Sequence, residues 1–266
     1  MELYRSAAIL SGLIPLAVAF WANRATSLAH ALAWACVAWL SWTSAVVLDD
    51  APTLNYLALC LTGGAGVAVL GARRPHVFAW NFVVLSLVAV MMWPIVETQL
   101  LGASSFDRLR VYFAAATLAV GIANYLPTRL APAAALLMLV CEVDLLWPAD
   151  LAWLEGDAIR SLRAAALASV PWLGWACWAL VRKDRTEFDS TWLDFRDRWG
   201  FVWSQRAREQ FNLAAQNAGW PVKLTWSGLA ARTGGAAPAE DRSNYLVALR
   251  AVLQRFLVPD VQGGGH

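Results

Sequence analysis

Charged residues are scarce in the first two thirds of this 266-residue chain. Overall, 15% of its residues are charged and 59% are hydrophobic, whereas globular proteins average about 25% charged residues. Nine of the 21 lysines and arginines precede residue 182, and all nine are arginines. The composition therefore predicts a membrane protein. Because no lysine lies in the apolar part, a retinal-type Schiff base is excluded there.

Other absences narrow the classes of site. The four cysteines, Cys36, Cys60, Cys141 and Cys177, fall in separate apolar segments without metal-ligand spacing. Neither G-x-S-x-G nor H-E-x-x-H occurs, and the glycine run at 63–66 lies inside an apolar segment where phosphate binding is not expected. A net charge of +2 without a basic stripe argues against nucleic acid. We expect no metal, no cofactor and no nucleic-acid partner.

What the sequence does contain is a series of long apolar segments. Hydrocarbon about 30 Å thick needs about 20 residues of helix. Seven segments approach that length: 6–22, 26–48, 52–72, 77–97, 109–126, 130–147 and 164–181. They are too long for strands of a membrane barrel. We predict an all-α fold, with a bundle of about seven transmembrane helices in the lipid bilayer over 1–181 and a small, mainly helical cytoplasmic tail over 182–266.

The basic residues indicate an orientation. With the N-terminus outside, the inner segments hold seven lysines and arginines and the outer segments hold five. This bias predicts N-out, C-in topology in the cytoplasmic (inner) membrane. The first segment also resembles a signal peptide, with Arg5 before the apolar core and a cleavage-like sequence at 17–19. Cleavage would place Arg73 and Arg74 outside, so we favour retention of the first segment.

Two carboxylates, Glu142 and Asp144, interrupt the sixth segment. A charge at this depth is costly unless it faces protein, water or a partner. Two helical positions differ by about 200°, so the two side chains point to opposite faces and do not form an acid/base pair. The structural interpretation is a buried ion pair with Arg110 or Arg163. The functional interpretation is a proton- or cation-binding carboxylate in a transporter, with Glu97 nearby.

Amphipathic helices are predicted in the tail over 188–218 and 241–258, and a glycine- and proline-containing linker over 227–239. Residues 222–226 are expected to be extended. Gly219, followed two residues later by Pro221, ends the first tail helix. Asp194 and Arg198 form an i,i+4 pair on this helix.

Aromatic residues recur on one face of that helix at steps of four and three. We call this face the aromatic stripe; it comprises Phe188, Trp192, Phe195 and Trp199. An apolar face of this size needs a cover, which is the second tail helix, the lipid headgroups or a protein partner.

Three functions follow as hypotheses. The first is a non-enzymatic assembly or regulatory protein that engages a partner through the amphipathic tail. The second is a transporter or channel for ions or small solutes that uses Glu142. The third is a membrane enzyme acting on lipid, which requires Glu97, Glu142 or Asp107 to converge on a wet pocket. The motifs point to no particular family, and neither substrate nor oligomeric state is indicated.

Overall fold

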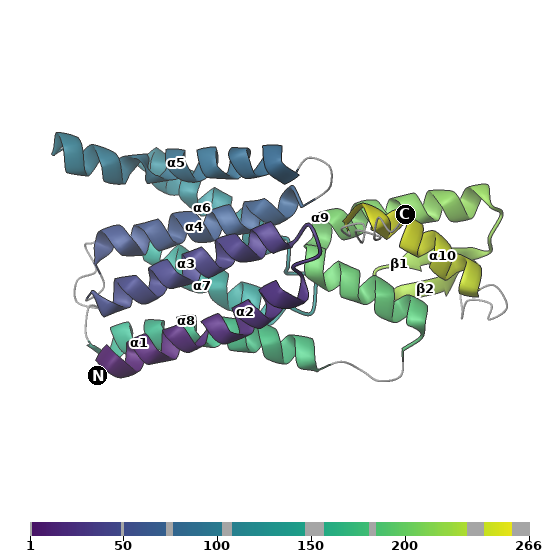
Figure 1. Cartoon of the computed structure of the whole chain (residues 1–266), viewed down its shortest axis with the longest axis horizontal. Coiled ribbons are helices and arrows are strands. Elements are labelled where there is room, and N and C mark those ends of the chain that lie inside the picture. The colour runs from purple at the N-terminus through teal and green to yellow at the C-terminus, as the bar shows by residue number, and fades with distance from the viewer. Residues whose placement is uncertain are drawn as a thin grey trace, which may run out of the picture.

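The computed structural model describes residues 2–48, 51–72, 77–102, 108–146, 157–180, 185–232 and 242–256. Within these ranges the secondary-structure elements are all α- or 3₁₀-helices apart from one short β-hairpin. Long helices lie side by side in a bundle, and the C-terminal helices and the hairpin are gathered at one end of it (Figure 1). The N-terminus lies at the opposite end (Figure 1).

Part of the bundle has the length and composition of membrane-spanning helices. Its helices are α1 (Glu2–Ser11), α2 (Leu13–Ala22), α3 (Ala29–Val47), α4 (Pro52–Leu70), α5 (Val77–Leu101), α6 (Arg108–Ala123), α7 (Ala131–Leu146) and α8 (Asp157–Ala179). Four helical stretches are long and apolar enough to cross a membrane: Tyr4–Ala22, Ala29–Val47, Pro52–Leu70 and Ala79–Leu100. The count of seven spans stays a prediction.

The first predicted segment is divided into α1 and α2. Pro15 has no N–H to donate to the carbonyl of Ser11, so the regular helix is interrupted one turn before it. Trp39 fits against this break, and its Nε1 donates to the carbonyl oxygen of Ile9 at 2.6 Å. A Cβ at Gly12 would lie 2.6 Å from the same Nε1. Glycine is therefore required where the indole of α3 contacts the broken helix.

Helices α4 and α6 approach each other through glycine. A Cβ added to Gly66 would lie 2.8 Å from the Cα of Gly121, and a Cβ added to Gly121 would lie 2.8 Å from the Cα of Gly66. Small residues permit such backbone contact between membrane helices, which gain stability from van der Waals packing. This contact fixes the end of α6, from which the α6–α7 connection reaches the tail.

Successive helices run in alternating directions, so several connections face the tail at one end of the bundle (Figure 1). Asn23, after α2, accepts a hydrogen bond from Nη1 of Arg198 at 3.3 Å. The carbonyl of Val69, near the end of α4, accepts one from Nε1 of Trp203 at 2.9 Å. Asn124, after α6, also contacts the tail. The tail is thus docked on the bundle at three separate places.

The tail consists of α9 (Glu187–Asn217), β1 (Val222–Thr225), β2 (Gly228–Ala231), α10 (Arg242–Leu253) and the 3₁₀ turn η2 (Gln254–Phe256). Helix α9 ends as the sequence predicts. Gly219 has φ of 68°, and the N–H of Trp220 donates to the carbonyl of Ala215 at 2.9 Å. This closes the last turn in the left-handed conformation that glycine favours.

The predicted linker is wrong over 228–231, where β2 pairs antiparallel with β1 and Val222 lies opposite Ala231. Asp189, in the first turn of α9, accepts a hydrogen bond from the N–H of Leu229 at 2.9 Å. Gly228 leaves space for this carboxylate, because an added Cβ would lie 2.3 Å from its Oδ1. The strand therefore depends on a contact with α9 that lies far away in sequence. Residues 233–241, in the remainder of the linker, lie outside the described residues.

The aromatic stripe is buried within the chain, and of the three covers expected for it the structure shows the second helical segment of the tail. Its members retain at most 4% of their surface. The ring of Phe256 lies 4.9 Å from that of Phe195 and 5.8 Å from that of Trp199. Phe188 packs against Phe211 from the second half of α9, at 5.5 Å. The chain's own C-terminal segment thus provides the cover that the stripe requires.

Candidate functional site

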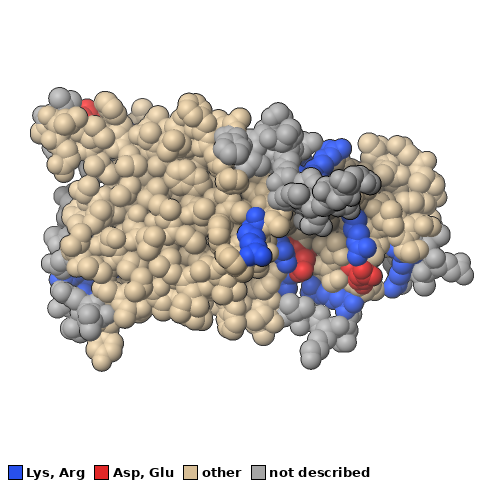
Figure 2. Space-filling model, viewed as in Figure 1, with Lys and Arg blue, Asp and Glu red and all other residues tan. Residues whose placement is uncertain are grey.

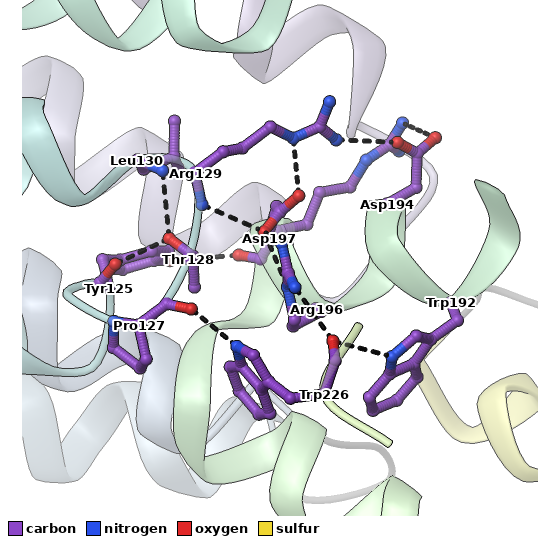
Figure 3. A network of polar contacts seen from close by, with 11 residues as sticks. Tyr125, Pro127, Thr128, Arg129, Leu130, Trp192, Asp194, Arg196, Asp197 and Trp226 are labelled. Atoms are coloured by element: carbon purple, nitrogen blue, oxygen red, sulfur yellow. Dashed lines mark hydrogen bonds and ion pairs between the residues drawn. The ribbon is translucent and has the colours of Figure 1, made fainter. Parts of the chain in front are cut away.

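The charged junction between bundle and tail is centred on Asp197 of α9, whose side chain is fully buried (Figure 3). Its carboxylate accepts hydrogen bonds from Nε of Arg129 at 2.5 Å and from the N–H of Arg129 at 3.2 Å. Arg196 donates to it from Nε at 2.9 Å and from Nη2 at 2.7 Å. A buried carboxylate is tolerated when opposite charges and donors surround it in this way. Arg129 belongs to the bundle, so this network joins the two parts of the chain.

The second arginine extends the network to the β-hairpin. Nη1 of Arg196 donates to the carbonyl of Trp226 at 2.9 Å, and Nε1 of Trp226 donates to the carbonyl of Pro127 at 2.7 Å. Trp226 lies in the hairpin turn, and Pro127 lies in the α6–α7 connection (Figure 3). Through these bonds the α6–α7 connection, which also carries Arg129, contacts the hairpin.

The α6–α7 connection is shaped by its own hydrogen bonds. Thr128 donates from its hydroxyl to the carbonyl of Tyr125 at 2.6 Å and accepts from the N–H of Leu130 at 3.1 Å. These bonds hold the tight turn that carries Arg129 (Figure 3). Arg129 also donates to Asp194 at 3.1 Å, and its guanidinium lies 4.7 Å from the ring centroid of Trp178.

A kink in α9 supplies the other contact at this junction. Gly200 has φ of 74° and ψ of −165°, a conformation that is essentially restricted to glycine. The kink frees backbone groups, and Asn124 binds them. Its side chain donates to the carbonyl of Trp199 at 3.2 Å and accepts from the N–H of Val202 at 2.9 Å. Its backbone carbonyl accepts from the N–H of Phe201 at 2.7 Å.

Two of the predicted acidic residues, Asp144 and Glu97, lie in separate ion pairs near the end of the bundle away from the tail. Asp144 pairs with Arg163 across α7 and α8 at 2.7 Å, and both side chains are largely buried. Glu97 of α5 pairs with Arg110 of α6. The structure therefore brings Asp144 to one of its two expected partners. It does not bring Glu97 and Asp144 together.

Glu142 is partly exposed on α7. No hydrogen bond or ion pair joins it to another residue that the structure describes. Asp107, the third member of the hypothetical lipid-cleaving site, lies outside the described residues. The three acidic residues of that hypothesis are therefore not seen to converge.

A cavity of about 420 Å³ lies inside the bundle, between its helices and α9. Apolar side chains form most of its wall, and Asp197 and Arg198 belong to its lining. Glu142 does not contribute to it. Within the part of the chain that the structure describes, no three metal-binding side chains lie close enough together to hold a metal ion.

Sequence reasoning missed the core of this site. It identified Asp194 and Arg198 as a pair, and the structure places them 3.7 Å apart. It did not connect Asp197 with Arg129, which lie 68 positions apart. Asp197 itself could have indicated the site, because it follows the stripe residue Phe195 by two positions and lies between Arg196 and Arg198 in the sequence. A carboxylate that close to a buried face needs a partner.

The bundle and the tail differ in their surface charge. On the face shown in Figure 2 the bundle is mostly uncharged, while blue and red side chains gather at the junction and over the tail. Fold and composition together define a helical membrane protein with a charged junction at one end. No protein-family model, no curated protein and no solved structure matches this chain.

Proposed function

We propose that the chain crosses the cytoplasmic membrane seven times, with its N-terminus outside and its tail inside. The alternating directions of α1–α8 support an odd number of crossings, with α1 and α2 counted as one. The tail lies at the end that carries Arg24 and Arg129, in agreement with the preference for basic residues inside. The ion pairs of Glu97 and Asp144 then lie toward the outer surface.

Within this topology, the protein acts as a non-enzymatic assembly or regulatory protein through its docked tail. The observation that carries the proposal is the burial of Asp197 between Arg129 of the bundle and Arg196 of the tail. A buried ion pair adds little net stability compared with apolar packing, and fixing one specific arrangement is a use to which such pairs are put. The junction therefore sets the position of the tail relative to the bundle. A partner then contacts the outer surface of the docked tail, since the aromatic stripe is covered.

The test is proximity labelling from the C-terminus in native membranes. The wild type is compared with Arg129→Met, which breaks the junction, and with the matched control Arg250→Met. Arg250 belongs to an exposed ion pair with Glu187 in the tail. We expect the control to keep the wild-type set of labelled neighbours and Arg129→Met to lose part of it at equal protein abundance. An unchanged set in Arg129→Met would contradict the proposal.

The two other hypotheses gain no comparable support. If Glu142 took part in transport, its carboxylate should line a cavity. Glu142 is not among the residues that line the cavity within the bundle. An enzyme acting on lipid would need Glu97, Glu142 or Asp107 to converge on a wet pocket, whereas Glu97 is paired with Arg110 and neither Glu97 nor Glu142 lines the cavity in the bundle.

A further inference from the structure

The cavity in the bundle opens toward the lipid-facing surface. Val18 on α2 and Trp175 on α8 both line it, and they are 55% and 51% exposed. These two helices lie next to each other at the edge of the bundle (Figure 1). In a membrane, hydrocarbon chains surround this edge. The volume of about 420 Å³ falls within the range of roughly 300–1,000 Å³ that ligand sites occupy.

Polarity is distributed unevenly along the cavity. Side chains such as Leu16, Ala35 and Leu137 form its wall within the bundle. The charged and amide side chains of its lining are Asn23, Asp197 and Arg198, and all lie at the tail end. A ligand that fits this arrangement is an amphiphile with an apolar chain among the helices and a polar group at the tail.

Arg198 has the free hydrogen-bonding capacity that such a ligand needs. Its Nε is buried and has no acceptor among the described residues. Its Nη1 reaches Asn23 at 3.3 Å, and its Nη2 lies 3.7 Å from Asp194. Both distances exceed the usual range of about 2.7–3.2 Å. The guanidinium stacks 5.0 Å from the ring centroid of Trp178, which also lines the cavity.

Local charge favours an anion at this end. The junction contains the arginines Arg129, Arg196 and Arg198 and the aspartates Asp194 and Asp197, which leaves a surplus of one positive charge. The carboxylate of Asp197 already accepts bonds from Arg129 and Arg196, so its repulsion of a second anion is reduced. By contrast, the carboxylate nearest to Arg198 is that of Asp194, which lies 3.7 Å from its Nη2 and is 49% exposed.

We propose that the cavity binds one acyl chain of an anionic phospholipid from the cytoplasmic leaflet, with the phosphate held by Arg198. The lipid enters between α2 and α8, and the phosphate supplies the oxygen acceptors that the guanidinium lacks. The choice of leaflet rests on the topology proposed above, whereas the site itself does not depend on the assembly or regulatory role.

Native mass spectrometry of the full chain, released from nanodiscs of equal parts phosphatidylglycerol and phosphatidylcholine, tests the proposal. We expect the wild type to retain one lipid and to prefer phosphatidylglycerol by about tenfold, the effect of a charge-assisted hydrogen bond of ordinary strength. No retained lipid, or two lipids retained equally well, would overturn the proposal. Inorganic phosphate forms a separate arm: Arg198-dependent thermal stabilisation by phosphate alone, without lipid retention, would identify a free anion instead.

Variants separate the chain site from the headgroup site. Ala35→Leu and Gly174→Leu fill the cavity and should lower lipid retention at least fivefold; a Cβ on Gly174 meets only Ala133, at 3.8 Å. Ala33→Leu is the matched control, since Ala33 lies on the exposed face of α3. Equal retention in all three variants would contradict a chain inside the bundle.

For the headgroup, R198Q should retain lipid but lose the preference for phosphatidylglycerol, and R198K should keep part of it. The control R206Q removes one positive charge from the same helix, where Arg206 stacks on Trp203 away from the cavity lining. A preference that R198Q keeps, or that R206Q loses equally, would refute the role of Arg198.

Discussion

Replacing Arg129 by methionine removes the bundle's half of the buried ion pair while keeping most of the apolar stem of the side chain. The side chain of Asp197 is fully buried and that of Arg129 is 14% exposed. After the substitution, Asp197 keeps the donors of Arg196 and the backbone N–H of residue 129, and it loses the side-chain Nε of Arg129. The carboxylate is then buried with incomplete compensation.

The magnitude follows from burial. Breaking a buried ion pair by removing one partner costs about 3–5 kcal/mol. The bond from Arg129 to Asp194 adds less than about 1 kcal/mol, because the Asp194 side chain is 49% exposed. Loss of the contact with Trp178 adds about 0.5–1 kcal/mol. Because Arg196 remains, we expect the pair itself to contribute about 3 kcal/mol, and the total with the two smaller contacts to be about 4 kcal/mol.

A double-mutant cycle with Asp197→Leu isolates the pair. Free energies of unfolding are measured by denaturant titration in mild detergent, with tryptophan fluorescence as the signal. Arg129→Met combined with Asp197→Leu should cost less than the sum of the single changes by about 2 kcal/mol. Arg250→Met, in an exposed pair, should cost less than about 1 kcal/mol. Additivity of the two junction variants within about 0.5 kcal/mol would refute the reasoning.

Three further predictions use stability in the same detergent. Gly200→Ala should destabilise the protein by more than about 2 kcal/mol, because of backbone strain and of the clash with Asn124. A stability equal to that of the wild type would contradict the positive φ of Gly200 and its contact with Asn124. Phe256→Ala should cost about 3–5 kcal/mol and raise the accessibility of the aromatic stripe to an aqueous quencher, whereas unchanged quenching would show that η2 is not the cover. Asp144→Asn should lower the melting temperature and Glu142→Gln should leave it nearly unchanged, because Asp144 alone has an ion-pair partner among the described residues; equal loss in both would contradict this difference.

Much of the fold was accessible from the sequence because it depends on local patterns. Apolar length predicted the helices of the bundle, and the Gly219–Pro221 signal predicted the end of α9. The linker prediction failed where Asp189 binds the strand at Leu229, 40 positions away. Such a contact leaves no periodic signal in the sequence. Gly228 looks like a turn or linker residue, but in the structure it leaves the space that the Asp189 carboxylate occupies.

The site was less predictable for the same reason. The sequence drew attention to the two carboxylates because they interrupt an apolar segment, and Asp144 does pair with Arg163. Asp197 lies in a charged helix, where a carboxylate normally faces water, and only the docking of α9 on the α6–α7 connection buries it. The aromatic stripe was recognised from its spacing, but spacing does not show which partner covers it.

The docking of the tail is tested most directly by amide exchange at Phe201 and Val202. Their N–H groups follow the kink at Gly200, and in the structure they donate to Asn124 of the bundle. Hydrogen–deuterium exchange should therefore show both amides protected in the wild type. It should also show both exposed in Asn124→Ala, while amides in the second half of α9 stay protected. Rapid exchange of these two amides in the wild type, with the rest of α9 protected, would contradict a docked tail.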